Sequence, residues 1–253
     1  MPLLEIQSLS RFFGGIKAVS EFTLSVSAGS VHGLIGPNGS GKTTVFNCLT
    51  GIYPPTAGRV LFNKERIDHL PPHQIVARGM ARTFQNLRLF AAMTALENVM
   101  VARHLHLRSG VLDAIVGTPS ARNDQRETMA LAADILSFCG LAGREDAIAS
   151  SLPYGLQRRL EIARALATEP KLLLLDEPAA GMNHAEAAAL KELVLAIRDR
   201  GVTVFIIEHN VRLVMGLCER VSVMDVGQLI ADGTPDHIVK NPAVIEAYLG
   251  TEL

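Results

Sequence analysis

The 253-residue sequence has few cysteines, almost no net charge and no long apolar run. Its three cysteines, Cys48, Cys139 and Cys218, lack metal-ligand spacing and fall in predicted helices, which is typical of buried thiols in a reducing compartment. A formal net charge of −1 argues against a broad nucleic-acid surface. No apolar run approaches the roughly 18–20 residues of a membrane-spanning helix, and the N-terminus has no signal-peptide pattern. We therefore expect a protein that neither inserts into a membrane nor is secreted.

What the sequence does contain is an alternation of short strands and helices. Residues 3–62 favour strands separated by glycine and proline turns, and the composition then shifts toward helix. Two apolar strands, 172–175 and 202–207, flank an alanine-rich helix at 185–199, which predicts a parallel sheet covered by helices. We expect an α/β fold with a mixed sheet core, an N-terminal antiparallel β part and a helical insertion. One domain, 1–253, would comprise a nucleotide-binding core at 1–87 and 166–253 and a helical subdomain at 88–165.

Local signals add detail to this outline. Thr94 and Glu97 have the spacing of a capping box ahead of a helix over 98–107. Apolar residues at helical spacing predict two further helices, around 129–136 and 156–167, and residues 109–120 resemble a loop. We also expect a strand at 81–85, a C-terminal hairpin at 221–231 and a helix at 242–249. There is no internal repeat and no low-complexity segment.

A glycine-rich stretch follows the short apolar strand at 31–35 and precedes a helix at 45–50. Strand, glycine loop and helix form the context of a phosphate-binding loop, in which backbone N–H groups and the helix N-terminus face phosphate oxygens. Lys42 would reach the β and γ phosphates, and Thr43 would offer its hydroxyl to Mg²⁺. The candidate nucleotide-binding residues here are Gly36, Pro37, Asn38, Gly39, Ser40, Gly41, Lys42, Thr43 and Thr44.

Two carboxylates, Asp176 and Glu177, follow the apolar strand at 172–175. Ligands of open α/β sheets bind at the carboxyl ends of strands, so Asp176 is a candidate for holding Mg²⁺ through water. Glu177 is a candidate for polarising the water that attacks the γ phosphate. A guanine-binding Asn-Lys-x-Asp motif is unsupported, because the nearest match, at 63–66, ends in Arg66.

The segment Leu152-Pro153-Tyr154-Gly155-Leu156-Gln157-Arg158-Arg159-Leu160-Glu161 and its continuation to Leu166 resembles the signature motif of ABC-type ATPases. The resemblance implies a P-loop ABC cassette that binds ATP and Mg²⁺. It implies that Gln85 senses Mg²⁺ and water, that His209 contacts the γ phosphate and that Phe13 stacks on adenine. Closure of two cassettes would bring the signature residues of one onto the nucleotide of the other. On this reading the catalytic residues are Glu177, His209 and Gln85, the metal site is Thr43, Gln85 and Asp176, and the further nucleotide contacts are Tyr154, Gly155, Gln157 and Asn183.

Two positions depart from the family pattern. Pro153 stands where serine is usual, and proline offers neither a hydroxyl nor an N–H group. Asn183 replaces the usual aspartate, which removes a charge and keeps a hydrogen-bond acceptor.

Several segments, including 13–19, 82–90, 177–183, 208–209 and 247–250, resemble the ATP-binding subunit of bacterial branched-chain amino acid importers. That resemblance implies two membrane permease subunits, a second ABC ATPase subunit that is a homologous chain or a second copy, and indirectly a solute-binding protein. The protein would act at the cytoplasmic face of the inner (plasma) membrane. Importers for urea or other amides share much of this sequence, so the solute stays open.

Two other classes of function remain as alternatives. A soluble mechanochemical ABC ATPase would be expected to carry tandem cassettes or a long coiled coil, and neither pattern is present. A module that couples nucleotide binding without turnover would fit Pro153 but not the presence of Glu177 and His209. The apolar residues Leu87, Leu89, Phe90 and Met93 are either a permease contact or ordinary core.

Overall fold

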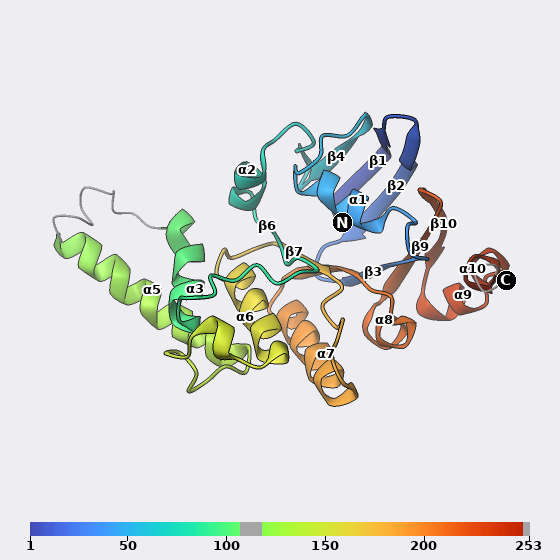
Figure 1. Cartoon of the computed structure of the whole chain (residues 1–253). Helices are drawn as coiled ribbons and strands as arrows, with labels where there is room; N and C mark the ends of the chain where they lie inside the picture. Colours follow the sequence, from blue (N-terminus) through green and yellow to red (C-terminus); the bar gives the residue numbers. More distant parts are fainter. Residues whose placement is uncertain (107–117, 250–253) are drawn as a thin grey trace. The chain divides into compact units, whose positions relative to one another are not determined.

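The computed structural model describes residues 1–106 and 118–249 and divides into two compact units (Figure 1). Unit 1 consists of Met1–Gln85 and Lys171–Leu253, and unit 2 of Asn86–Pro170. The chain leaves unit 1 immediately after Gln85 and returns at Lys171, just before the second set of apolar strands. The sequence predicts these two boundaries at residues 87 and 166.

The N-terminal sheet of unit 1 is antiparallel, with the strand order β2-β1-β4-β5. Val19, Phe22, Leu24 and Val26 are buried along β2 with exposed or half-exposed residues between them, so one face of the sheet meets the core. Within the predicted strand region, the β-like runs 3–9 and 22–26 indicate two strands, and the observed β1 and β2 extend beyond both runs. The bounds are β1 Pro2–Phe13, β2 Ile16–Ser27, β4 Ala57–Phe62 and β5 Glu65–Arg66.

The second sheet of unit 1 is mixed, with the order β10-β9-β3-β8-β7-β6. Neighbours from β9 to β6 are parallel, and β10 pairs antiparallel with β9. Every residue of β3, β7 and β8 is buried, as the continuous apolar runs predict. The bounds are β3 Val31–Ile35, β6 Met80–Arg82, β7 Leu172–Asp176, β8 Thr203–Ile207, β9 Arg220–Asp225 and β10 Gln228–Gly233. Because these strands are parallel, the loops that follow β3, β6, β7 and β8 emerge at the same edge.

Helices and a hydrophobic core complete unit 1. A cluster of buried residues joins the antiparallel sheet, α1 and the central strands, with Phe22, Phe46 and Phe205 among its largest members. Among the described residues, no helix combines the length and apolar character that crossing a bilayer requires. The helices are α1 Lys42–Leu49, α2 Pro72–Ala77, α7 His184–Asp199, α8 Val211–Leu217, α9 Pro235–Val239 and α10 Pro242–Leu249.

Unit 2 is helical, as expected. The capping box is confirmed: Thr94 Oγ1 accepts from the N–H of Glu97 at 3.1 Å, and the Glu97 carboxylate accepts from the N–H of Thr94 at 2.8 Å. Helix α3 packs against both α5 and α6. The elements are α3 Ala95–Ala102, η1 Arg103–His106, α5 Pro119–Phe138, η2 Ala149–Ser151 and α6 Tyr154–Leu166.

Two element predictions need correction. The strand expected at 81–85 is β6, which ends at Arg82, because only the N–H of Thr83 continues the ladder by bonding the Leu174 carbonyl at 3.0 Å. Gln85 therefore lies beyond the strand and is exposed. The helix expected over 98–107 begins earlier, at Ala95, and tightens to a 3₁₀ turn after Ala102. Most of the loop expected at 109–120 lies outside the described residues, and its last two residues begin α5.

Candidate nucleotide-binding site

The glycine-rich loop joins the buried end of β3 to the first turn of α1. Gly41 ends the loop at φ +104, and a Cβ there would lie 2.4 Å from the carbonyl oxygen of Ala18, so no other residue fits. Helix α1 has no side-chain N-cap. Its first backbone N–H groups are thus not used by a capping side chain, which suits a site for phosphate oxygens.

Lys42 is bound to its own loop. It is only 6% exposed, and its Nζ donates to the carbonyls of Gly36 and Pro37 at 2.8 Å each and approaches Ser40 Oγ at 3.3 Å. Burial lowers the pKa of the Lys42 ammonium, while the carboxylates of Glu177 and Asp176 oppose that decrease. The Lys42 ammonium is thus bonded to neutral groups and lies near the carboxylates of Asp176 and Glu177. From this position the side chain can rotate toward a bound phosphate.

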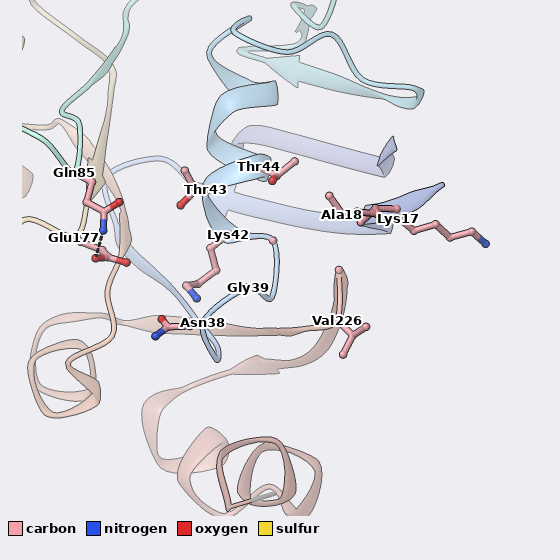
Figure 2. Close-up of a pocket in the computed structure, with 13 residues that line it drawn as sticks. Lys17, Ala18, Asn38, Gly39, Lys42, Thr43, Thr44, Gln85, Glu177 and Val226 are labelled. Carbon is pink, nitrogen blue, oxygen red and sulfur yellow. Dashed lines mark hydrogen bonds between the residues drawn. The ribbon is translucent and has the colours of Figure 1, made fainter. Parts of the chain in front are cut away.

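A pocket of about 500 Å³ opens beside this loop. Figure 2 shows it extending from Gln85 and Glu177 at one end, past Lys42, Thr43 and Thr44, to Ala18 and Val226 at the other. The lining residues are Ile16, Lys17, Ala18, Asn38, Gly39, Gly41, Lys42, Thr43, Thr44, Gln85, Glu177, Val226 and Gly227. Five of these were not candidate site residues from the sequence: Ile16, Lys17, Ala18, Val226 and Gly227. The first three lie in the segment 13–19 that resembles the importer subunits, but that resemblance gave them no role in the site.

The two carboxylates at the end of β7 have different surroundings. Asp176 is buried; its Oδ2 accepts from Arg82 Nη2 at 2.6 Å, and its Oδ1 has no hydrogen-bond partner among the described residues. Glu177 lies in the pocket with φ +46, a backbone conformation that non-glycine residues rarely adopt. Its Oε2 accepts from Gln85 Nε2 at 2.9 Å and lies 3.6 Å from His209 Nδ1 (Figure 2 shows the first contact). Gln85, Glu177 and His209 therefore meet at one point.

Glu208, which precedes His209, is a site residue whose role the sequence did not reveal. It is completely buried, and its carboxylate accepts from the N–H groups of Ala179 at 2.7 Å and Asn210 at 3.4 Å. Burial raises the pKa of Glu208. Arg82 has a comparable supporting role, since it bonds Asn47 Oδ1 and Thr50 Oγ1 of the α1 segment as well as Asp176. These contacts fix the ends of β7 and β8 relative to the phosphate loop.

Phe13 lies at the end of β1 and does not line the pocket. Its ring is 39% exposed, packs edge to face on Tyr53 with centroids 5.2 Å apart, and has the Arg11 guanidinium 4.6 Å from its centroid. Its strand partner is Ile16, which does line the pocket. Phe13 thus lies on the same sheet face as a pocket-lining residue without lining the pocket itself.

The signature residues lie in unit 2, at the start of α6. Pro153 is the N-cap and supplies no side-chain bond, Gly155 is buried, and the Tyr154 ring is 43% exposed. Gln157 donates to the Leu152 carbonyl at 2.7 Å and so closes the turn before the helix. In unit 1, the Asn183 oxygen that was expected to face nucleotide caps α7 by accepting from the N–H of Glu186 at 3.0 Å.

Comparison with known proteins identifies the family of this chain. The family described as "ABC transporter" matches residues 19–180, which span the phosphate loop, the signature helix and both carboxylates. The chain belongs to the ABC transporter family. A second family, described as "Branched-chain amino acid ATP-binding cassette transporter", matches this ABC cassette at residues 228–253.

Relatives of this cassette match over almost its entire length. It is 48% identical over 250 residues to the high-affinity branched-chain amino acid transport ATP-binding protein BraF of Pseudomonas aeruginosa, with 98% of each chain covered. It is 47% identical to the protein LivG of Escherichia coli, which has the same description and the same coverage. A crystal structure of an ATP-binding cassette of an ABC transporter in its ADP conformation is 33% identical, with a TM-score of 0.86 and 99% of each chain covered.

Proposed function

We propose that this chain is the ATP-binding and ATP-hydrolysing subunit of an importer for branched-chain amino acids. The observation that supports it best is the convergence of Gln85 and His209 on the carboxylate of Glu177, which lines the pocket beside the phosphate loop. The near-full-length similarity to BraF and LivG supports the solute class.

In this proposal Lys42 moves from the carbonyls of its own loop to the β and γ phosphates of ATP. The exposed Asn38 and Gly39 bind the remaining phosphate oxygens, together with Gly41, Ser40 and Thr44. Glu177 accepts a proton from the attacking water, and His209 and Gln85 orient that water and the γ phosphate. The left-handed backbone of Glu177 directs the carboxylate into the pocket. A hydrogen bond from the N–H of Glu177 to the Ile207 carbonyl, at 2.9 Å, helps to hold this strained backbone conformation.

The residues proposed for Mg²⁺ fit that ion. Thr43 is exposed at the pocket, Gln85 carries an amide oxygen, and Asp176 has a buried oxygen without a partner among the described residues. These are hard oxygen donors, which Mg²⁺ prefers together with phosphates and water. In the described ranges no three His, Cys, Asp or Glu side chains cluster as a metal site, so the nucleotide would complete the coordination. The ion would neutralise charge on the β and γ phosphates.

The proposed partners are a second cassette and two membrane permeases at the cytoplasmic face of the inner membrane. The uncapped start of α6, with Tyr154, Gly155 and Gln157, would face the nucleotide of the other cassette. Asn183 would join that interface while capping α7. A small apolar pocket beside the Gln85 segment is proposed for permease contact; it is lined by Thr50, Ile52, Pro72, Ile75, Val76, Met80, Arg82 and Phe84. In unit 2, Leu87, Leu89 and Met93 are half-buried and Phe90 is 47% exposed, which also favours contact over core.

The test is a Glu177→Gln variant, with Glu192→Gln, an exposed glutamate on α7, as the matched control. We expect ATPase turnover to fall by about a hundredfold or more, because general-base catalysis is lost, and ATP with Mg²⁺ to hold the variant as a dimer. The control should keep wild-type turnover and remain sensitive to ATP. Equal rates for the two variants would overturn the general-base role of Glu177.

The solute is tested by purification through a tag on this chain in mild detergent. Recovery of two multi-span permeases and ATPase stimulation by a leucine-loaded binding protein would support the importer. Stimulation by a urea- or amide-loaded binding protein instead would assign a different solute, and a chain recovered alone with solute-independent ATPase would favour the mechanochemical alternative.

A further inference from the structure

The base end of the nucleotide pocket contains an unusual turn. Val226 and Gly227 form the two-residue connection between β9 and β10, with φ +42 and φ +79. Positive φ at both positions is the requirement of a type I′ hairpin turn, for which Asn-Gly and Asp-Gly are strongly preferred. Valine is β-branched and disfavours this conformation, and at 79% exposure its side chain gains little from burial. Local structure therefore does not explain why valine stands here.

The turn is held firmly against the phosphate loop. The N–H of Gly227 donates to the Ser40 carbonyl at 3.0 Å, and the Gly227 carbonyl accepts from the N–H of Ser20 at 2.9 Å. A Cβ on Gly227 would lie 3.0 Å from the Ala18 carbonyl oxygen, so the two backbones are in close contact. These anchors fix the position of the neighbouring Val226 side chain relative to the loop.

A second exposed aliphatic side chain lies across the same end of the pocket. Ile16 is 71% exposed at the start of β2 and lines the pocket together with Lys17, Ala18 and Val226. Figure 2 shows Val226 opposite Lys17 and Ala18, at the far end from Gln85 and Glu177, with the Lys17 side chain directed away from the phosphate loop. The space between the two hairpin ends is thus bordered by apolar side chains and continues directly into the phosphate site.

We infer that Val226 and Ile16 form an apolar clamp for the base of the bound nucleotide, and that this contact is the function of the valine side chain at position 226. A flat nucleobase between the two exposed side chains would bury them and remove both of its own faces from water. Neither contact needs a polar group. This inference rests on the proposed nucleotide site, whose phosphate end is independent of the clamp. The clamp adds to the stacking expected from Phe13 and does not replace it.

The experiment compares Val226→Asn with Val239→Asn, the same change at an exposed valine that ends α9 and does not line the pocket. ADP affinity is measured by calorimetry, and tripolyphosphate affinity by its competition with ADP. The midpoint of thermal unfolding is measured on the protein without nucleotide. For Val226→Asn we expect about tenfold weaker ADP binding, unchanged tripolyphosphate binding and a midpoint that is equal or higher, because asparagine suits the turn. Ile16→Ser should weaken ADP in the same selective way, and Val239→Asn should change neither affinity.

Equal ADP affinity in Val226→Asn and the wild type would overturn the clamp and leave the nucleotide site standing. A parallel loss of tripolyphosphate affinity, or a lower thermal midpoint, would overturn it in favour of a purely structural role for the turn. Failure of the wild type to bind either ADP or tripolyphosphate would instead overturn the proposed nucleotide site itself.

Discussion

The two units of this ABC cassette differ in how they surround some of their buried charged side chains. In unit 1, Lys42 is held by carbonyls and a hydroxyl, and Asp176 has one paired and one unpartnered oxygen among the described residues. In unit 2, Arg158 and Glu161 are 0% and 2% exposed and bond each other at 2.8 Å within one turn of α6. Buried charge that no opposite charge neutralises, such as that of Lys42, opposes folding, so it is found where a ligand can complete it. The two buried charges of α6 neutralise each other instead, so they support structure without a ligand.

Breaking the pair in unit 2 is expected to have the largest effect on stability. The Arg158 guanidinium also donates to the Tyr154 hydroxyl at 3.1 Å, and Glu161 accepts from the N–H of Arg88 at 3.4 Å. Glu161→Leu leaves a buried cation and should lower the free energy of unfolding by about 3–5 kcal/mol, measured by urea denaturation. ADP affinity should not change, because the pocket residues belong to unit 1.

The control for this prediction is Arg126→Met, which removes an exposed arginine on α5 and should leave stability nearly unchanged. The double variant Arg158→Met with Glu161→Leu should recover much of the loss, because it leaves no unpaired buried charge. A drop in ADP affinity at unchanged stability would contradict the assignment of this pair to structure.

Unit 1 has a third kind of buried ionisable group, which is kept neutral. His32 is 1% exposed in β3; its Nε2 lies 2.7 Å from Ser222 Oγ, which donates to Asp232 Oδ1 at 2.9 Å, and Arg220 Nε bonds the same carboxylate at 3.0 Å. Burial lowers the pKa of His32 to about 4, Asp232 opposes this decrease and Arg220 adds to it. Between pH 6.5 and 4 the unfolded chain binds a proton here that the folded chain does not, so stability falls as the pH falls.

Over the whole window this single group would remove roughly 3 kcal/mol of stability. The measurement is urea unfolding at pH 7 and pH 5 for the wild type and for His32→Gln, which cannot titrate. We expect a smaller decrease for the variant, and the difference between the two isolates His32 from other acidic groups. An equal decrease would show that His32 does not contribute to the pH dependence.

The smallest expected effect concerns helix caps, where the units also differ. The capping box of α3 in unit 2 satisfies backbone N–H groups that no side chain satisfies at α1 in unit 1. Thr94→Ala should lower the free energy of unfolding by about 1 kcal/mol and leave ADP binding unchanged. Glu97→Gln keeps the acceptor and serves as control, with stability close to the wild type. Weaker ADP binding in Thr94→Ala would show that this cap also affects the nucleotide site.

The sequence by itself determined the features that short stretches of chain encode. The phosphate loop, the Asp176–Glu177 pair and the capping box at Thr94 depend on residues within about ten positions of one another, so spacing and side-chain chemistry predict them. The apolar runs also fixed the central strands, whose residues are all buried in β3, β7 and β8. The sequence did not determine where the edge strand β6 ends. An edge strand continues only as far as its one neighbour, here β7, offers backbone hydrogen-bond partners.

Only the tertiary structure decided which distant residues complete the site. Arg82 bonds Asp176, Glu208 bonds the Ala179 backbone, and Ile16 and Val226 border the same pocket although they lie far apart in the sequence. The physical reason is that parallel strands bring the ends of separate segments to one edge of a sheet, and the pairing register sets which side chains meet there. No local sequence pattern specifies that register. The contacts between these distant residues could therefore not be predicted from the sequence before the strand order was known.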